Sequence, residues 1–106
     1  MAAAALWVNF DPSVGQEVKK KRPAIIISNN TSNKHLKRYQ VLPLSTQTEK
    51  IYPSETIVKL AGKESKAMAD QLTTVSELRF INRAGSITQD ELMEVERIVK
   101  LQLGLK

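Results

Sequence analysis

Apolar residues along most of the chain occur in short runs separated by turn-forming residues. Leu6–Phe10 alternates in polarity, whereas Ala24–Ser28 is a continuous run rich in β-branched residues and too short for a helix. The first pattern is typical of a half-buried strand, and the second of a strand that is buried on both faces. Further strands are predicted at Arg38–Leu44, Glu55–Leu60, Ser65–Val75 and Leu78–Ile81.

The segments between these runs predict turns and loops. Asp11–Gly15 ends the first strand, and we expect the basic segment that follows to be a loop as far as Arg22. Pro23 disfavours helical geometry at the residue before it, so Arg22 is expected to be extended. Asn29–Asn33 predicts a polar turn, and Ser45–Tyr52 predicts a loop.

The end of the chain has a different periodicity. Thr88 and Glu91 have the spacing of a capping box, in which each side chain satisfies a backbone amide of the first helical turn. Apolar residues then recur at three- and four-residue steps, and Gly104 stands where a C-terminal cap belongs. This pattern predicts an amphipathic helix of about 15 residues that packs on the sheet. Short strands with one closing helix predict a mainly β fold, a small barrel of roughly five to seven strands.

Composition narrows the possible chemistry. The chain has 106 residues, of which 42% are hydrophobic and 25% charged, so we expect one folded domain over residues 1–106. It has no cysteine, which excludes disulfides, thiolate nucleophiles and cysteine-bound metals. The single histidine, His35, excludes a histidine pair and a multi-histidine metal site, and we interpret it as an exposed, noncatalytic residue.

Location is inferred from what the sequence lacks. No stretch approaches the roughly 20 apolar residues that cross a bilayer, so no membrane association and a cytoplasmic location are expected. The alanines at positions 2–5 are too few for the apolar core of a signal peptide. We interpret residues 1–5 as an expression scar or a variant start.

Positive charge is concentrated in one part of the chain. The formal net charge is +5, and the window from Glu17 to Arg38 holds seven basic residues against a single acid. The excess therefore lies in about a fifth of the chain. A solvated lysine loop would explain it, and so would a surface that follows the phosphates of a nucleic acid.

Polar residues at the ends of predicted strands are the candidates for chemistry. Arg22 suits bidentate phosphate binding, although it is also the last of four consecutive cations. Ser45 and Thr46 place two hydroxyls side by side, where a capped turn is the simpler explanation. Glu17 is a lone acid among cations. Asp70 interrupts an apolar segment and is therefore either paired or functional.

Ordered blocks of the sequence resemble the MazF/PemK toxins of bacterial type II toxin–antitoxin systems. The resemblance extends from Leu6 to about Leu105. Its blocks are Trp7–Gly15, Glu17, Arg22–Asn29, Leu42–Gln47, Tyr52-Pro53 and Ala69–Gln71. It implies an SH3-like β-barrel of the CcdB/PemK type with a C-terminal helix, a homodimer and a cognate antitoxin.

The implied activity is that of an mRNA interferase, an endoribonuclease that cuts single-stranded mRNA at short motifs and thereby inhibits translation and growth. In this family the substrate's own 2′-OH attacks the adjacent phosphorus without a metal ion or other cofactor. The products are a 2′,3′-cyclic phosphate and a 5′-OH. The alternative is a non-enzymatic toxin on the same barrel, like the related gyrase poisons, or a plain nucleic-acid-binding module.

The resemblance also implies roles for individual residues. Arg22 would stabilise the charge on the phosphorane and could protonate the leaving oxygen, and Ser45, where most members have threonine, would donate to a nonbridging oxygen. Glu17 or Asp70 would accept the 2′-OH proton, and the sequence does not decide between them. Contacts with the rest of the RNA are assigned to Lys19, Lys20, Lys21, Asn29, Thr46 and Gln47.

The chain departs from the family pattern at three places. The loop after Glu17 lacks the usual glutamine and glycine, so its path is not fixed by the resemblance. Met68 stands where some members have a catalytic arginine, which places more weight on Arg22. Ala4-Ala5 replaces the usual glycine–acid pair before the first strand.

Overall fold

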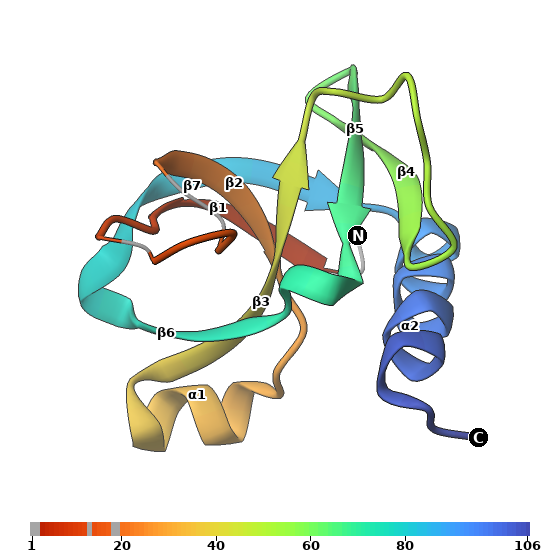
Figure 1. Ribbon diagram of the computed structural model, residues 1–106. Coiled ribbons are helices and arrows are strands. Elements are labelled where there is room, and N and C mark those ends of the chain that lie inside the picture. Colours follow the sequence, from red (N-terminus) through yellow and green to blue (C-terminus); the bar gives the residue numbers. More distant parts are fainter. Residues whose placement is uncertain (1–2, 13, 18–19) are drawn as a thin grey trace.

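The strands form one antiparallel sheet that curls on itself, with a helix at its side (Figure 1). The computed structural model describes residues 3–12, 14–17 and 20–106. The helices among them are α1 Asn30–Leu36, α2 Gln89–Leu103 and the 3₁₀ turns η1 Ala69–Gln71 and η2 Glu77–Arg79. The strands are β1 Ala3–Asn9, β2 Lys21–Ile26, β3 Arg38–Ser45, β4 Glu55–Leu60, β5 Lys63–Met68, β6 Thr73–Ser76 and β7 Phe80–Ile87.

The long strand β3 connects the two parts of the sheet. Hydrogen-bonded neighbours follow the order β4-β5-β3-β2-β1-β7, and β6 pairs with β3 outside this path. Residues 38–41 of β3 pair with β6, whereas Leu44 and Ser45 at its end pair with β5. The end of β3 therefore lies where the β4–β5 hairpin meets β2, and Ser45 lies at this junction.

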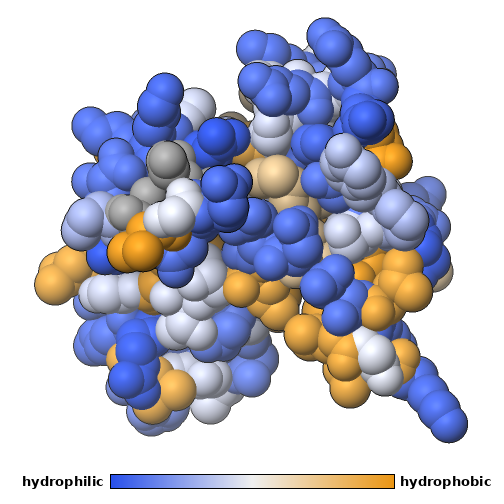
Figure 2. Space-filling model, in the orientation of Figure 1, coloured by the Kyte–Doolittle hydropathy of each residue, from blue (hydrophilic) through white to orange (hydrophobic). Residues whose placement is uncertain are grey.

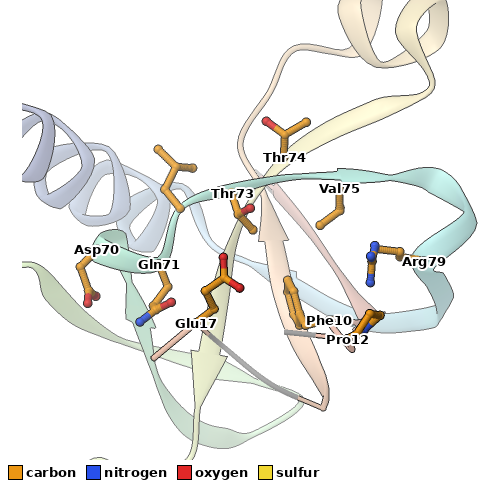
Figure 3. Close-up of a pocket in the computed structure, with 10 residues that line it drawn as sticks. Phe10, Pro12, Glu17, Asp70, Gln71, Thr73, Thr74, Val75 and Arg79 are labelled. Carbon is orange, nitrogen blue, oxygen red and sulfur yellow. The ribbon is translucent and has the colours of Figure 1, made fainter. Parts of the chain in front are cut away.

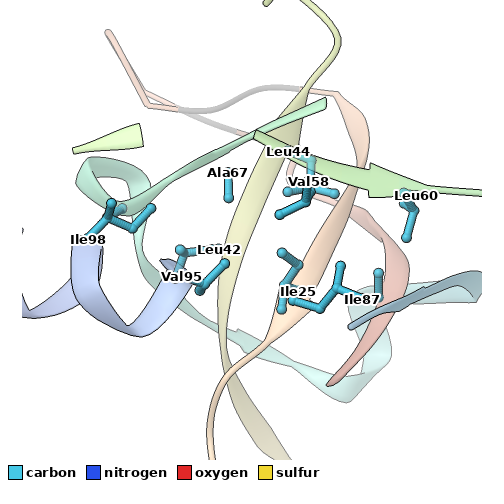
Figure 4. Close-up of a cluster of buried hydrophobic side chains, with 11 residues drawn as sticks. Ile25, Leu42, Leu44, Val58, Leu60, Ala67, Ile87, Val95 and Ile98 are labelled. Carbon is cyan, nitrogen blue, oxygen red and sulfur yellow. The ribbon is translucent and has the colours of Figure 1, made fainter. Parts of the chain in front are cut away.

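Both faces of the central strands are covered, which explains the continuous apolar run in β2. Ala24 and Ile25 point to opposite faces, and both are fully buried. Ala24 belongs to a small cluster with Val8, Phe10, Val41 and Val75, enclosed by the curl of the sheet. Ile25 belongs to the larger cluster that packs against Val95 and Ile98 of α2 (Figure 4).

The predicted C-terminal helix is confirmed, together with both of its caps. Thr88 Oγ1 accepts from the Glu91 amide at 3.2 Å, Glu91 accepts from the Thr88 amide at 2.8 Å, and Gly104 follows in the left-handed conformation. The second carboxylate oxygen of Glu91 accepts from the Lys59 amide of β4 at 2.6 Å. Burial raises the pKa of Glu91, but these backbone hydrogen bonds outweigh burial and hold the pKa below its ordinary value. An ionised carboxylate thus ties α2 to the sheet.

Three predicted segments have a different structure, and one of them, the predicted strand Leu78–Ile81, is divided between η2 and the start of β7. Asn29–Asn33 was predicted to be a turn, but Asn29 is the N-cap of α1, and its Oδ1 accepts from the Ser32 amide at 2.8 Å. This helix is too short and too polar to give an apolar period. The predicted strand Ser65–Val75 is broken by η1, because the chain must leave the β4–β5 hairpin before it can pair with β3 as β6.

The boundaries of the first strands also differ from the prediction. β1 begins at Ala3 rather than Leu6, and Ala5 is fully buried, although alanine has little intrinsic preference for strands. β2 begins at Lys21, so Arg22 lies in the sheet and not in the preceding loop. Within the described residues, no helix is both long and apolar enough to cross a membrane.

Candidate active site

Three neighbouring strands place Arg22, Ser45 and Lys66 in one row across the sheet. Ala24 of β2 pairs with Pro43 of β3, and Arg22 and Ser45 each lie two residues beyond this last pair, on the same face of the sheet. On the other side of β3, Ser45 pairs directly with Lys66 of β5. Paired residues carry their side chains on the same face, with strands about 4.8 Å apart. The row therefore presents a guanidinium, a hydroxyl and an ammonium group on one face.

These three side chains line one cavity of about 540 Å³, which we call the Arg22–Ser45 cavity. Its other lining residues are Gln16, Glu17, Lys20, Gln47, Met68 and Gln71. Among the described residues, no group of three or more histidine, aspartate or glutamate side chains is placed to hold a metal ion. With three cationic side chains and one carboxylate in its lining, the cavity suits an anionic ligand such as phosphate.

Ser45 is the last residue of β3, and its side chain is held by the turn that follows. Its exposed fraction is 9%, and its Oγ accepts a hydrogen bond from the Gln47 amide at 3.2 Å. This bond uses an oxygen lone pair and leaves the hydroxyl hydrogen to be donated elsewhere. The capped turn that was the simpler explanation for Ser45 is therefore present, and it is compatible with a hydroxyl donor in the cavity.

Glu17 lies in the loop between β1 and β2 and is exposed. Its carboxylate accepts from the Val14 amide at 2.6 Å, and its own amide donates to the Val14 carbonyl at 3.1 Å. These two bonds fix a tight turn and orient the side chain. Glu17 lines the Arg22–Ser45 cavity and also a neighbouring one of about 370 Å³.

Asp70 lies in this neighbouring cavity and does not line the Arg22–Ser45 cavity. It is exposed, on η1. Figure 3 shows Glu17 between Asp70 and Arg79 in this neighbouring cavity. Of the two acids between which the sequence does not decide, Glu17 is therefore the one that shares a cavity with Arg22 and Ser45.

Arg79 on η2 holds the loop that carries Glu17. Its Nη1 donates to the Asn9 carbonyl at 3.0 Å and to the Asp11 carbonyl at 2.7 Å. From the other end of the loop, the Lys20 amide donates to Asp11 Oδ1 at 2.9 Å. The two ends of the loop are thus held together, and Glu17 is presented between them.

The residues expected to contact RNA are only partly brought together. Lys20 and Gln47 line the Arg22–Ser45 cavity, Thr46 is exposed between Ser45 and Gln47, and Lys21 is exposed at the start of β2. Lys19 lies outside the described residues. Lys20 and Lys21 thus precede Arg22 directly along the chain, at the end of the loop and the start of β2.

Asn29 is separated from this group. It lies beyond the opposite end of β2 from Arg22, and its side-chain oxygen caps α1. It lines another cavity, of about 590 Å³, together with Ile27, Arg83 and Glu96. Asn29 does not line the Arg22–Ser45 cavity and is therefore not placed to contact a base bound there.

Sequence reasoning missed Lys66 and Gln71, both of which line the Arg22–Ser45 cavity. Lys66 lies between two buried small residues, Ser65 and Ala67, so it is a cation at an alternate position of a strand. The sequence carried no signal for it, because a lysine at an alternate position of a half-buried strand is expected to face solvent, and the partial burial of Lys66 is seen only in the fold. Within the predicted strand Ser65–Val75, Asp70 was the candidate because it interrupts an apolar segment.

Comparison with known proteins places the chain in a family. A family model described as PemK-like, MazF-like toxin of type II toxin–antitoxin system matches residues 4–103. The chain belongs to this family. Endoribonuclease MazF9 of Mycobacterium tuberculosis is 27% identical to this chain over an alignment 115 residues long, gaps included. The alignment covers 99% of this chain and 98% of that protein.

Solved structures agree with this assignment. The crystal structure of MazF from Deinococcus radiodurans matches with a TM-score of 0.88 and 25% identity, over 98% of this chain and 96% of that chain. An endoribonuclease of a mycobacterial species, solved in complex with its cognate antitoxin, matches with a TM-score of 0.82 over 100% and 96% of the two chains. At 18% identity, the second match shows the fold alone. The mainly β fold with a C-terminal helix and the family resemblance are confirmed.

Proposed function

We propose that this toxin is an endoribonuclease that cuts single-stranded mRNA at short motifs and thereby inhibits translation and growth. The observation that carries the proposal is the Arg22–Ser45 pair in one cavity that Glu17 also lines. The guanidinium and the hydroxyl can donate to phosphate oxygens, and the carboxylate can accept a proton. The activity named for the relative from Mycobacterium tuberculosis supports the same reaction class.

In the proposed reaction, the 2′-OH of the substrate attacks the adjacent phosphorus. Glu17 accepts the proton of this hydroxyl, and the bond between phosphorus and the 5′-oxygen breaks as the new bond to the 2′-oxygen forms. Arg22 stabilises the charge that builds on the nonbridging oxygens and donates a hydrogen bond to the leaving 5′-oxygen. That oxygen takes its proton from solvent water, and Glu17 later returns its own proton to solvent. Ser45 donates to a nonbridging oxygen, and one such preorganised donor is typically worth about 10²–10³ in rate. The products are a 2′,3′-cyclic phosphate and a 5′-OH, and no metal ion takes part.

The first test is cleavage without divalent cations. Purified protein incubated with a mixed-sequence RNA in EDTA should produce fragments with 5′-OH ends. Sequencing of these ends would reveal the recognition motif in the same experiment. Intact RNA, or fragments that form only when magnesium is added, would contradict the proposal.

We further infer a cognate antitoxin, a homodimer and a cytoplasmic location. The family description names a toxin–antitoxin system, and the basic window of the chain suits an acidic partner segment. Large apolar side chains on the surface support self-association: Trp7, Leu78 and Ile81 are 38%, 90% and 51% exposed. Figure 2 shows another apolar region over the C-terminal end of α2, where Leu101 and Leu103 are exposed.

A further inference from the structure

Lys66 is an enclosed cation in the lining of the Arg22–Ser45 cavity. Its side chain is 12% exposed, and that of its ion-pair partner Glu55 is 7% exposed, with 3.2 Å between Nζ and Oε1. Nζ also donates to the Lys50 carbonyl at 3.1 Å and lies 5.7 Å from the centre of the Tyr52 ring. These contacts fix the position of the ammonium group beside the turn before β4, while the Lys66 side chain lines the cavity.

Glu55 also forms hydrogen bonds with Tyr52 that do not involve Lys66. Its Oε1 accepts from the Tyr52 amide at 2.9 Å, and its own amide donates to the Tyr52 carbonyl at 2.9 Å. These bonds close the turn before β4 by themselves. A glutamine at this position could make both of them, because its amide oxygen is also an acceptor. The ion pair can therefore be removed while the turn is kept.

The ammonium group has donor capacity beyond its described protein acceptors. It carries three N–H groups, and among the described residues Glu55 and Lys50 accept from two of them. The direct pairing of Lys66 with Ser45 places its side chain on the same face as the hydroxyl. Arg22 of β2 and Lys66 of β5 lie on the two strands that flank β3, and both line the cavity of about 540 Å³, so two anionic groups can bind side by side.

We propose that Lys66 binds a backbone phosphate of the RNA next to the phosphate at which the chain is cut. This inference rests on the proposed endoribonuclease function and extends it to a second phosphate subsite. Arg22 holds the reacting phosphate in its planar fork, whereas the ammonium of Lys66 acts as a point charge for the neighbouring one. The subsite would help to fix which phosphate lies beside Ser45.

The test uses the salt dependence of RNA binding. A 2′-O-methyl oligonucleotide of mixed sequence cannot be cut by the proposed reaction, so its affinity can be measured by fluorescence anisotropy over a series of salt concentrations. For single strands, the slope of log K against log salt changes by about 0.7 for each phosphate contacted. The double variant E55Q/K66M keeps the net charge and leaves no unpaired buried carboxylate. Its slope should be about 0.7 shallower than that of the wild type.

Two single variants separate phosphate binding from a purely structural role. E55Q keeps the ammonium and removes its anionic competitor, so it should bind RNA at least as tightly as the wild type. The matched control K63M, on the same strand at an exposed position, should keep the wild-type slope. Circular dichroism establishes that each variant is folded.

The outcomes also separate this inference from the proposed function. If the wild type cuts RNA but E55Q/K66M keeps its slope, or if E55Q binds as weakly as the double variant, the role of Lys66 is overturned and the proposed function stands. If the wild type neither cuts nor binds RNA, both proposals fall. A shallower slope in E55Q/K66M alone supports the subsite.

Discussion

Replacing Arg22 with alanine should lower the rate of RNA cleavage by at least about 10²–10³-fold, or about 3–4 kcal/mol of transition-state stabilisation. The guanidinium shares the cavity with Ser45 and, in the proposed reaction, donates to the nonbridging oxygens on which negative charge develops. Arg22→Lys should recover only part of the rate, because an ammonium group cannot donate in the same planar, bidentate geometry. Single-turnover rates on a mapped cleavage site measure the effect.

Arg97→Ala is the matched control for this prediction. Arg97 lies on the exposed side of α2, where it pairs with Glu94, and such surface pairs contribute little to stability. This variant should cut RNA at the wild-type rate. If Arg22→Ala remains folded and cuts RNA equally well, Arg22 is not part of the catalytic machinery. If the wild type binds RNA but never cuts it, the alternative of a nucleic-acid-binding module gains support.

Replacing Glu17 with glutamine should lower the cleavage rate by about 10²–10⁴-fold, the range expected for loss of a general base. Glutamine keeps an oxygen that can accept from the Val14 amide, so the turn of the loop should persist. The amide cannot take up the proton of the 2′-OH. The same single-turnover assay measures the loss, and RNA affinity is expected to change much less than the rate.

Asp70→Asn distinguishes the two acids left open by the sequence. Asp70 lines the neighbouring cavity and not the Arg22–Ser45 cavity, so its replacement should change the rate by no more than a few-fold. The opposite pattern, a large loss with Asp70→Asn and a small one with Glu17→Gln, would move the general base to Asp70. It would also require the 2′-OH of the RNA to lie on the η1 side of the reacting phosphate.

Local sequence patterns predicted local structure well. The Thr88–Glu91 capping box and Gly104 predicted both ends of α2, and the predicted strand Glu55–Leu60 is confirmed as β4. These features depend on hydrogen bonds and side-chain periods within a few residues. The helix α1 could not be predicted in this way, because its seven residues carry no apolar stripe.

The arrangement of the candidate site depends on pairings between distant strands. Arg22 and Ser45 were identified separately, but only the pairing of β2 with β3 brings them to the same cavity. Lys66 enters the same row through the register of β3 with β5, which the sequence does not encode locally. Asn29 shows the opposite case, because a polar residue beside the motif serves as a helix cap away from the cavity.

The most direct test of the proposed chemistry changes one atom of the substrate. An RNA oligonucleotide with a mapped cleavage site is compared with the same oligonucleotide carrying a single 2′-deoxyribose on the 5′ side of the scissile phosphate. Because the 2′-oxygen is the proposed nucleophile, the substituted strand should remain intact at that site while still competing for binding. Cleavage of both strands at similar rates would show that the nucleophile comes from elsewhere and would contradict the mechanism.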